Sequence, residues 1–221
     1  MIEAVIFDVD GTIADTERHG HLPAFNAAFA HHGLDIVWQP AEYGKLLAIT
    51  GGRPRIASDL RARGFGAAAD LLAVHIHRTK TALFRDRILA GDITARPGLV
   101  DVVADLHNAR IRTAVATTGS RAWVEPLLGH LLGDHSMEVV VTGDDVGQLK
   151  PHPEVYLRVL DELGLAPEHA LAVEDSAVGL RAASAAGLST VVITNSYTAE
   201  QDFTGALAVL NTFARFMECL T

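Results

Sequence analysis

Short apolar runs that alternate with helical patterns limit the folds open to this chain more than any other feature. Five such runs are rich in β-branched or small residues: Ala4–Phe7, Thr113–Ala116, Glu138–Val141, Leu171–Val173 and Thr190–Ile193. Each is too short for a core helix and is typical of a buried strand. Between them apolar residues recur at helical spacing, at Leu99, Val102, Val103 and Leu106. The same spacing recurs at Tyr156, Val159, Leu160 and Leu163, and Gly164 is expected to end that helix. The alternation predicts a parallel sheet with helices on both faces.

The segment from about Thr16 to Ile88 interrupts this alternation. It contains helical patterns, for example at Leu71, Leu72 and Ile76, but no convincing pair of strands. Strands and helices alternate again after Arg96-Pro97-Gly98. We therefore predict two domains: a Rossmann-like α/β core formed by residues 1–15 and 89–221, and an all-helical cap inserted at residues 16–88.

Composition excludes several classes of function. No apolar stretch approaches the roughly 18 residues that a membrane-spanning helix needs. A formal net charge of −9 argues against broad binding of nucleic acids or anionic membranes. Cys219 is the only cysteine, so no intrachain disulfide can form, and the first residues resemble neither a signal nor a transit peptide. We expect a cytoplasmic monomer that acts on a small molecule.

Four polar segments follow the predicted strands or lie in loops beside them. They are Asp8-Val9-Asp10-Gly11-Thr12, Thr117-Thr118-Gly119-Ser120, Lys150-Pro151 and Glu174-Asp175. Ligands of open α/β sheets bind at the carboxyl ends of the strands, so these segments are expected to share one site. Asp8 and Asp10 point the same way and repel each other, which favours a bound cation. Adjacent acids at Glu174-Asp175 suggest a hard cation with oxygen ligands.

Taken singly, these segments have ordinary explanations. The aspartate pair could belong to a solvated turn that caps a helix, in which Gly11 lets amides approach an anion and the Thr12 hydroxyl bonds the turn. Thr117 and Thr118 could cap the helix expected near Arg121, a role that is compatible with phosphate binding. Most lysines like Lys150 are solvated. Their occurrence together, in order along the sheet, is far more specific.

As a set, the four segments resemble the motifs of the haloacid dehalogenase superfamily of phosphohydrolases. Asp8-Val9-Asp10-Gly11-Thr12 matches the first motif, Thr117 the second, Lys150 the third and Glu174-Asp175 the fourth. The resemblance covers the whole chain and includes a helical cap after the first motif. It implies Mg²⁺-dependent phosphoryl transfer to an aspartate and then to water.

The resemblance also implies a role for each core residue. Asp8 is expected to be the nucleophile, and Asp10 the acid that protonates the leaving oxygen and then the base that activates water. Mg²⁺ is expected on the Asp8 carboxylate, the Asp10 backbone carbonyl and Asp175, with Glu174 reaching it directly or through water. The remaining phosphoryl oxygens are assigned to three residues: Thr117, the Thr118 amide and Lys150.

A second resemblance rests on segments in or beside the cap: Ala14-Asp15-Thr16-Glu17-Arg18, Gly20-His21, Ala24-Phe25-Asn26, Tyr43 with Leu46-Leu47, Thr50-Gly51-Gly52-x-x-Arg55-Ile56 and Ile76-His77-Arg78-Thr79-Lys80. They are similar to those of CbbY-type phosphatases, which are associated with Calvin-cycle carbon fixation and remove xylulose-1,5-bisphosphate, an inhibitor of Rubisco. Physical reasoning adds that Gly51-Gly52 can present amides to a second phosphate beside basic side chains. We therefore expect Arg55→Ala to weaken binding of a bisphosphate more than that of a monophosphate. The expected substrate-binding residues of the cap are Glu17, His21, Tyr43, Thr50, Gly51, Gly52, Arg53, Arg55, Arg78 and Lys80.

Three positions depart from that subgroup: Arg53 stands where lysine is usual, Pro54 where glutamate is usual, and Leu149-Lys150 where two lysines are frequent. The preferred interpretation is a sugar-phosphate phosphatase that acts on the 1-phosphate of xylulose-1,5-bisphosphate. The alternatives are a β-phosphoglucomutase-like phosphomutase, a phosphoglycolate phosphatase, and a non-catalytic binding protein on the same fold. Intact Asp8 and Asp10 argue against the last of these.

Overall fold

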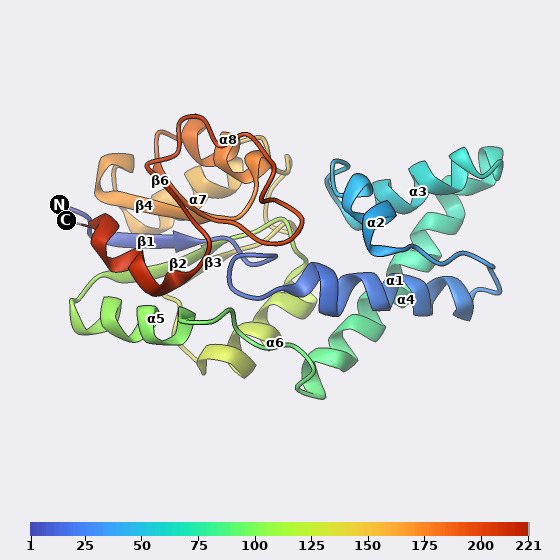
Figure 1. Ribbon diagram of the computed structural model, residues 1–221, viewed down its shortest axis with the longest axis horizontal. Coiled ribbons are helices and arrows are strands. Elements are labelled where there is room, and N and C mark those ends of the chain that lie inside the picture. The colour runs from blue at the N-terminus through green and yellow to red at the C-terminus, as the bar shows by residue number, and fades with distance from the viewer. Residues whose placement is uncertain (221) are drawn as a thin grey trace. The chain divides into compact units, whose positions relative to one another are not determined.

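The structure, a computed structural model, describes residues 1–220 and divides into two compact units (Figure 1). Unit 1 comprises Met1–Asp15 and the chain from Thr94 onward. Unit 2 comprises Thr16–Ile93. The chain therefore leaves unit 1 directly after the first strand and its following turn, and returns to it for all the other strands.

Unit 1 is built on a parallel sheet of six strands: β1 (Ala4–Phe7), β2 (Arg112–Ala116), β3 (Val139–Val141), β4 (Ala170–Glu174), β5 (Ser189–Ile193) and β6 (Ala208–Leu210). Their order is β3-β2-β1-β4-β5-β6, and every neighbouring pair is parallel. The α/β fold expected from the sequence is confirmed. In the register, Phe7 lies opposite Val115 on β2 and Val173 on β4. The residues that follow these three strands therefore meet at one edge.

Helices cover both faces of this sheet, as Figure 1 shows. They are α5 (Leu99–Asn108), α6 (Arg121–Leu132), α7 (Glu154–Leu163) and α8 (Ala177–Ala185), with 3-10 turns at Pro167–His169 and Phe213–Leu220. Helices α7 and α8 pack with Ala4 and Ile6 in one buried cluster. Phe7 points to the opposite face, because side chains alternate along a strand, and contacts the Phe216 ring at 6.4 Å between centroids. The central strand is thus buried on both sides.

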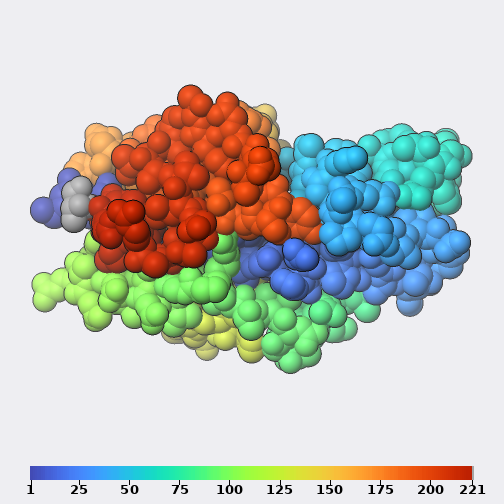
Figure 2. Space-filling view, in the orientation of Figure 1, coloured from blue at the N-terminus to red at the C-terminus, as the bar shows by residue number. Residues whose placement is uncertain are grey.

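Two details of unit 1 bear on the sequence predictions. Helix α7 ends at Gly164, which adopts a left-handed conformation with φ of 66°, as its position after the apolar pattern suggests. Strand β6 was not predicted. It has three residues, none of them buried, and the chain that follows β5 forms a continuous surface on the face seen in Figure 2.

Unit 2 is entirely helical over its described residues. After a single π-helical turn at Glu17–His21 come α1 (Leu22–His31), α2 (Pro40–Leu46), α3 (Gly52–Ala62), a 3-10 turn at Gly66–Ala68 and α4 (Ala69–Leu89). Helix α4 packs against both α1 and α3. Phe25, Phe29, Trp38 and Tyr43 are fully buried and form an aromatic core with ring centroids 4.8–5.8 Å apart. Unit 2 therefore has a core of its own.

Candidate active site

The carboxyl-terminal edge of the sheet gathers the residues singled out in the sequence. Asp8 follows β1, Thr117 follows β2, and Glu174 ends β4 with Asp175 directly after it. The Asp8 amide donates to the Val173 carbonyl at 2.9 Å, so the pairing of β1 with β4 extends into the site. Asp8, Glu174 and Asp175 are all buried. The sheet thus brings three acids together where they are largely shielded from water.

Lys150 is the cation at the centre of this cluster. Its ammonium group donates to the Asp8 Oδ1 at 2.7 Å, to the Glu174 Oε1 at 2.6 Å and to the Ala116 carbonyl at 2.8 Å. These three short bonds account for its three hydrogens, and a longer contact of 3.4 Å joins the ammonium group to the Tyr156 hydroxyl. The neighbouring carboxylates raise the pKa of Lys150 against the effect of its burial, so the side chain is charged. In this arrangement Lys150 balances the acids, and a phosphoryl oxygen would have to replace one of its acceptors.

Glu174 is held more firmly than its neighbours. Its Oε1 accepts from Lys150 and also from the Tyr156 hydroxyl at 2.5 Å, while Oε2 accepts from the Asp175 amide at 3.3 Å. A Cβ on Gly179 would lie 1.9 Å from Oε2, so α8 approaches the carboxylate with bare backbone. Glu174 is therefore confined between Lys150, Tyr156 and the first turn of α8.

The donor set fits a hard divalent cation. Carboxylate oxygens of Asp8, Glu174 and Asp175 all lie within 4.8 Å of one another. The Lys150 ammonium group bonds two of the three acids, so the cluster has more carboxylates than cations, and oxygen ligands are those that Mg²⁺ prefers. Burial raises the pKa of Asp8 to about 8 despite the nearby Lys150. An additional positive charge beside Asp8 would lower its pKa and keep it ionised near neutral pH.

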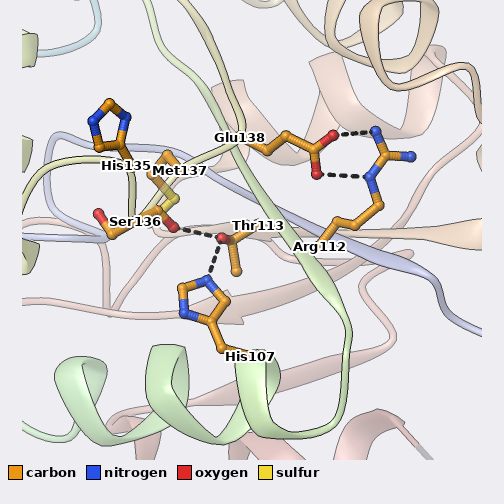
Figure 3. Close-up of a pocket in the computed structure, with 7 residues that line it drawn as sticks. All are labelled: His107, Arg112, Thr113, His135, Ser136, Met137 and Glu138. Carbon is orange, nitrogen blue, oxygen red and sulfur yellow. Dashed lines mark hydrogen bonds and ion pairs between the residues drawn. The ribbon is translucent and has the colours of Figure 1, made fainter.

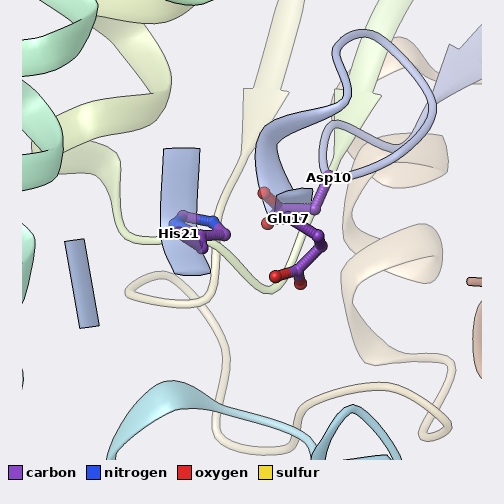
Figure 4. A group of neighbouring side chains, drawn as sticks. All are labelled: Asp10, Glu17 and His21. Atoms are coloured by element: carbon purple, nitrogen blue, oxygen red, sulfur yellow. The ribbon is translucent and has the colours of Figure 1, made fainter. Parts of the chain in front are cut away.

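The turn after β1 places Asp10. It is held by backbone bonds from the Gly11 amide to the Ala14 carbonyl (2.8 Å) and from the Ile13 amide to the Val9 carbonyl (3.0 Å). Within the described residues the buried Thr12 hydroxyl makes no hydrogen bond, so the expectation that it bonds the turn is wrong. The half-buried Asp10 side chain, drawn in Figure 4, projects from this rigid turn.

Arg96, which is distant in sequence, donates hydrogen bonds to the same turn and to the residues after β5. Its guanidinium donates to the carbonyls of Gly11 (2.6 Å), Ile193 (3.0 Å) and Thr194 (2.8 Å), and to that of Asn211 at 3.3 Å. The sequence marked Arg96 only as the return to the core. Its structural role joins the turn after β1 to the end of β5.

Thr117 and Thr118 follow β2 as expected. The Thr117 Oγ1 accepts from the Gly119 amide at 3.0 Å, which leaves its own hydroxyl hydrogen to be donated. The carbonyl of Thr118 is packed against Gly143, where a Cβ would lie only 2.4 Å away. A hydroxyl with a hydrogen to donate therefore lies at the end of β2, next to the strand that leads to Asp8, as binding of a phosphoryl group requires.

A hollow at the amino-terminal ends of β2 and β3 offers a different location for a site (Figure 3). Its polar groups largely satisfy one another. His107 Nε2 lies 2.9 Å from the Thr113 hydroxyl, which donates to the Ser136 carbonyl at 2.7 Å, while Arg112 pairs with Glu138 at 2.6 Å. It lies at the strand ends opposite Asp8. The acidic cluster is the better candidate.

In unit 2, a chain of hydrogen bonds links three of the expected substrate-binding residues. Arg55 donates to the Tyr43 hydroxyl at 3.0 Å, and that hydroxyl donates in turn to Glu17 (Figure 4 draws Glu17). Arg55 also donates to the carbonyls of Leu46 (3.1 Å) and Ile49 (3.3 Å), and it is buried. All three of its nitrogens are thus used inside unit 2. By contrast Arg53 is exposed and makes no hydrogen bond or ion pair among the described residues.

The other expected residues of unit 2 do not all lie together. The buried Lys80 ammonium lies 2.8 Å from His21 Nδ1 and over the rings of Phe25 and Phe84 at 4.7 and 5.0 Å from their centroids. Arg78 is exposed and lies about 200° around α4 from Lys80, since each residue of a helix advances by about 100°. Thr50, Gly51 and Gly52 form the entry to α3, where Gly51 has a φ of 90°.

His77 gives unit 2 a dependence on pH. Its burial and the charges of Lys80, His21, Arg53 and Arg55 lower its pKa to about 4, from an ordinary 6.5. Between these values the unfolded chain binds a proton that the folded chain does not, so stability falls as pH decreases from 6.5 towards 4. We expect the wild type to lose about 2 kcal/mol more than His77→Gln between pH 7 and pH 5, measured by urea unfolding. Equal losses in the two proteins would contradict this.

Three residues of the active site were not predicted from the sequence. Tyr156 bonds Glu174, Asn195 donates to Asp175 at 2.6 Å, and Arg96 braces the turn after β1. Tyr156 carried a signal in the apolar stripe of its helix, but the position of its hydroxyl did not follow from that stripe. Asn195 could have been found by extending the search to the polar residues that follow β5.

Comparisons with known proteins agree on one family. The model of haloacid dehalogenase-like hydrolases matches residues 2–187. The protein CbbY of Cereibacter sphaeroides is 46% identical over 217 residues, which cover 97% of this chain and 94% of that protein. The crystal structure of CbbY from Rhodobacter sphaeroides in complex with phosphate has a TM-score of 0.90 and 44% identity, covering 98% of this chain and 96% of the other. A mutant of that protein in complex with xylulose-(1,5)bisphosphate has a TM-score of 0.89 and 44% identity, with 97% and 96% covered.

Proposed function

We propose that this chain, which belongs to the haloacid dehalogenase-like hydrolase family, is a Mg²⁺-dependent phosphatase that removes the 1-phosphate of xylulose-1,5-bisphosphate through an intermediate on Asp8. The observation that carries the proposal is the buried Asp8 carboxyl, which lies 2.7 Å from Lys150 among further acids suited to a divalent cation. The substrate is proposed from the relative whose mutant was crystallised with that bisphosphate.

Residues of unit 1 account for the chemistry. Asp8, Asp175 and the Asp10 carbonyl would hold Mg²⁺, with Glu174 close by, and the ion would supply the charge that cancels repulsion between a carboxylate and a phosphate dianion. An Asp8 oxygen attacks phosphorus, so a bond to Asp8 forms as the bond to the sugar oxygen breaks. Asp10 protonates that oxygen, then takes a proton from the water that hydrolyses the intermediate.

Binding of the transferred phosphoryl group is assigned to three groups at the strand ends. The Thr117 hydroxyl has a hydrogen left to donate, and the Thr118 amide donates no hydrogen bond within the described residues. Lys150 would exchange its bond to Asp8 for one to a phosphoryl oxygen, since its bonds to Glu174 and Ala116 anchor it in place. These donors are in position before the charge develops, which favours the transition state.

Unit 2 carries a separate set of anion-binding groups that suits a second phosphate. The amides of Gly52 and Arg53 lie in the first turn of α3, where helix amides have no intrahelical acceptor. Pro54 contributes no amide, and the Arg53 side chain is exposed. Glu17, His21, Tyr43, Thr50, Gly51, Arg78 and Lys80 remain proposed contacts to the sugar or its phosphates.

A phosphate-release screen with Mg²⁺ tests the proposed activity. Purified protein is incubated with xylulose-1,5-bisphosphate, fructose 1-phosphate, 2-phosphoglycolate and glucose 1-phosphate, the last also with a trace of glucose 1,6-bisphosphate. We expect the highest kcat/KM with xylulose-1,5-bisphosphate and a pentulose 5-phosphate as product. Isomerised glucose phosphate without free phosphate would establish a mutase, and preference for 2-phosphoglycolate would refute the bisphosphate.

Replacing Arg53 tests the second phosphate. Because its side chain has no partner in unit 2, Arg53→Ala should raise KM for the bisphosphate about tenfold, with little change in kcat or in KM for a monophosphate. The matched control is Arg61→Ala, at the other end of α3, where the exposed arginine pairs with Asp70. Equal effects on both substrates would remove Arg53 from the distal phosphate. Arg55→Ala is a less direct test, because it also deletes three hydrogen bonds within unit 2.

A further inference from the structure

Asn195 lies beside the acid that the proposed function assigns to the metal. It comes two residues after β5, which pairs with β4, and its Nδ2 donates to Asp175 Oδ2 at 2.6 Å. Asp175 is 6% exposed. A donor this close to one carboxylate oxygen limits the rotation of the carboxylate group. The bond therefore acts on the direction of the Asp175 carboxylate.

The Asn195 amide is itself fixed in one orientation. Its Oδ1 accepts from the Tyr197 amide at 2.8 Å, and its backbone amide donates to the Thr198 hydroxyl at 3.0 Å. The Thr198 amide returns a bond to the Asn195 carbonyl at 3.2 Å, and Thr198 is buried. With Oδ1 committed to a backbone donor, Nδ2 must be the atom that faces Asp175. The Tyr197 amide thus determines which end of the Asn195 side chain reaches the acid.

Gly11 restricts the same pair from the opposite side. A Cβ at this position would lie 2.2 Å from Asp175 Oδ2 and 2.6 Å from Asn195 Nδ2. The turn after β1 is itself held in place by the bond from Arg96 to the Gly11 carbonyl. Asp175 Oδ2 is therefore enclosed between the backbone of Gly11 and the amide of Asn195, and its contact with that amide is enforced by packing.

We propose that Asn195 is a positioning residue that holds the Asp175 carboxylate in the orientation in which it binds the metal ion. The proposal rests on the proposed function for the role of Asp175. Asn195 does not touch the reacting atoms. Groups that orient a metal ligand in this way typically contribute 10- to 100-fold to metal affinity.

Calorimetric titration of the phosphate-free protein with MgCl₂ tests this without relying on turnover. Asn195→Ala removes the donor and the acceptor, while Asn195→Asp keeps an oxygen for the Tyr197 amide and replaces only the donor. We expect both variants to bind Mg²⁺ at least tenfold more weakly than wild type. Thr198→Val, which removes only the bond to the Asn195 backbone, should bind Mg²⁺ as wild type does.

The result has a kinetic counterpart. If Asn195 acts through Asp175, raising the Mg²⁺ concentration should restore most of the kcat of Asn195→Ala, whereas a distorted site would stay impaired. Mg²⁺ affinity in Asn195→Asp that is equal to or tighter than in wild type would overturn the proposal, as would a loss in Thr198→Val as large as in Asn195→Ala. Absence of Mg²⁺ binding by wild type would overturn the proposed function and this inference together, whereas unaltered affinity in an active Asn195→Ala would overturn the inference alone.

Discussion

Asp8→Asn is expected to reduce phosphate release by about four to six orders of magnitude while leaving the fold intact. An amide oxygen is a poor nucleophile, so no covalent intermediate forms and the second step has no starting point. Asparagine has the same shape as aspartate and keeps an oxygen that can accept a hydrogen bond from Lys150. In the wild type that bond joins Lys150 Nζ to Asp8 Oδ1 at 2.7 Å. The measurement is phosphate release with saturating Mg²⁺, together with acid-stable incorporation of labelled phosphate, which the variant should lack.

Stability of the same variant gives an independent result. Because burial raises the pKa of Asp8 to about 8 from an ordinary 3.8, its carboxyl binds a proton more readily in the folded chain than in the unfolded chain. Wild type without metal should therefore lose stability as pH rises from about 4 to 8, and Asp8→Asn should not share that loss. In EDTA at pH 8 the variant should unfold at higher urea than wild type.

A matched variant separates these effects from general changes of charge. Asp105→Asn removes an exposed carboxylate from the last part of α5, which leads into the amino-terminal end of β2, and should change neither turnover nor the pH dependence of stability. A folded Asp8→Asn protein with more than about 1% of wild-type turnover would exclude Asp8 as the nucleophile.

Much of the architecture follows from local sequence patterns. Strand β1, and strand β4 up to Glu174, consist of apolar residues, because a central parallel strand is buried on both faces, and this pattern is hard to mistake. Strand β6 has no such pattern, since its three residues lie at the sheet edge and remain partly exposed. Its pairing with β5 depends on tertiary contacts that leave no periodic signal.

The sequence predicted those residues of the candidate site that are charged and follow a strand. It did not predict Tyr156, whose hydroxyl belongs to a residue at an apolar position of its helix. Asp8, Glu174 and Asp175 are acids that a strand end would seldom carry without a function. In the structure Asp8 and Glu174 accept hydrogen bonds from Lys150, and oxygens of all three acids lie within 4.8 Å of one another. Tyr156 follows the apolar spacing of α7, and only its depth in the core brings its hydroxyl to Glu174. The spacing of apolar residues shows which face of a helix is buried, but it does not show which group the end of a long side chain contacts.

Basic residues of unit 2 show the same limit. The sequence alone does not distinguish the roles of Arg53 and Arg55, because both are cationic residues close to Gly51-Gly52. Helical phase separates them: Arg55 shares the buried face of α3 with Ile56 and Leu60, while Arg53 faces water. The buried arginine then meets Tyr43, and its charge lies 5.2 Å from the centroid of that ring. Which arginine can reach a ligand is therefore a property of packing.

Lys150→Met should be the most damaging single change to the stability of unit 1. Lys150 is 5% exposed and is the cation bonded to both Asp8 and Glu174, so its loss leaves two buried carboxylates facing each other. Removing one partner from a buried ion pair typically costs 3–5 kcal/mol. We expect a loss of about 4 kcal/mol in EDTA at pH 8, measured by urea unfolding, and no detectable turnover.

The dependence of that loss on pH identifies its cause. Lys150 lowers the pKa of Asp8 against the effect of burial, so without the ammonium group Asp8 binds its proton more firmly in the folded chain. The unfolded chain at pH 8 does not bind that proton, so the variant should lose stability more steeply than wild type as pH rises from 5 to 8. Mg²⁺ should recover part of the difference, because it replaces the missing positive charge. Lys45→Met, which removes an exposed lysine from α2, should leave stability within about 0.5 kcal/mol of wild type. A loss in Lys150→Met that is the same at pH 5 and pH 8 would mean that packing of the side chain, and not its charge, holds the acids in place.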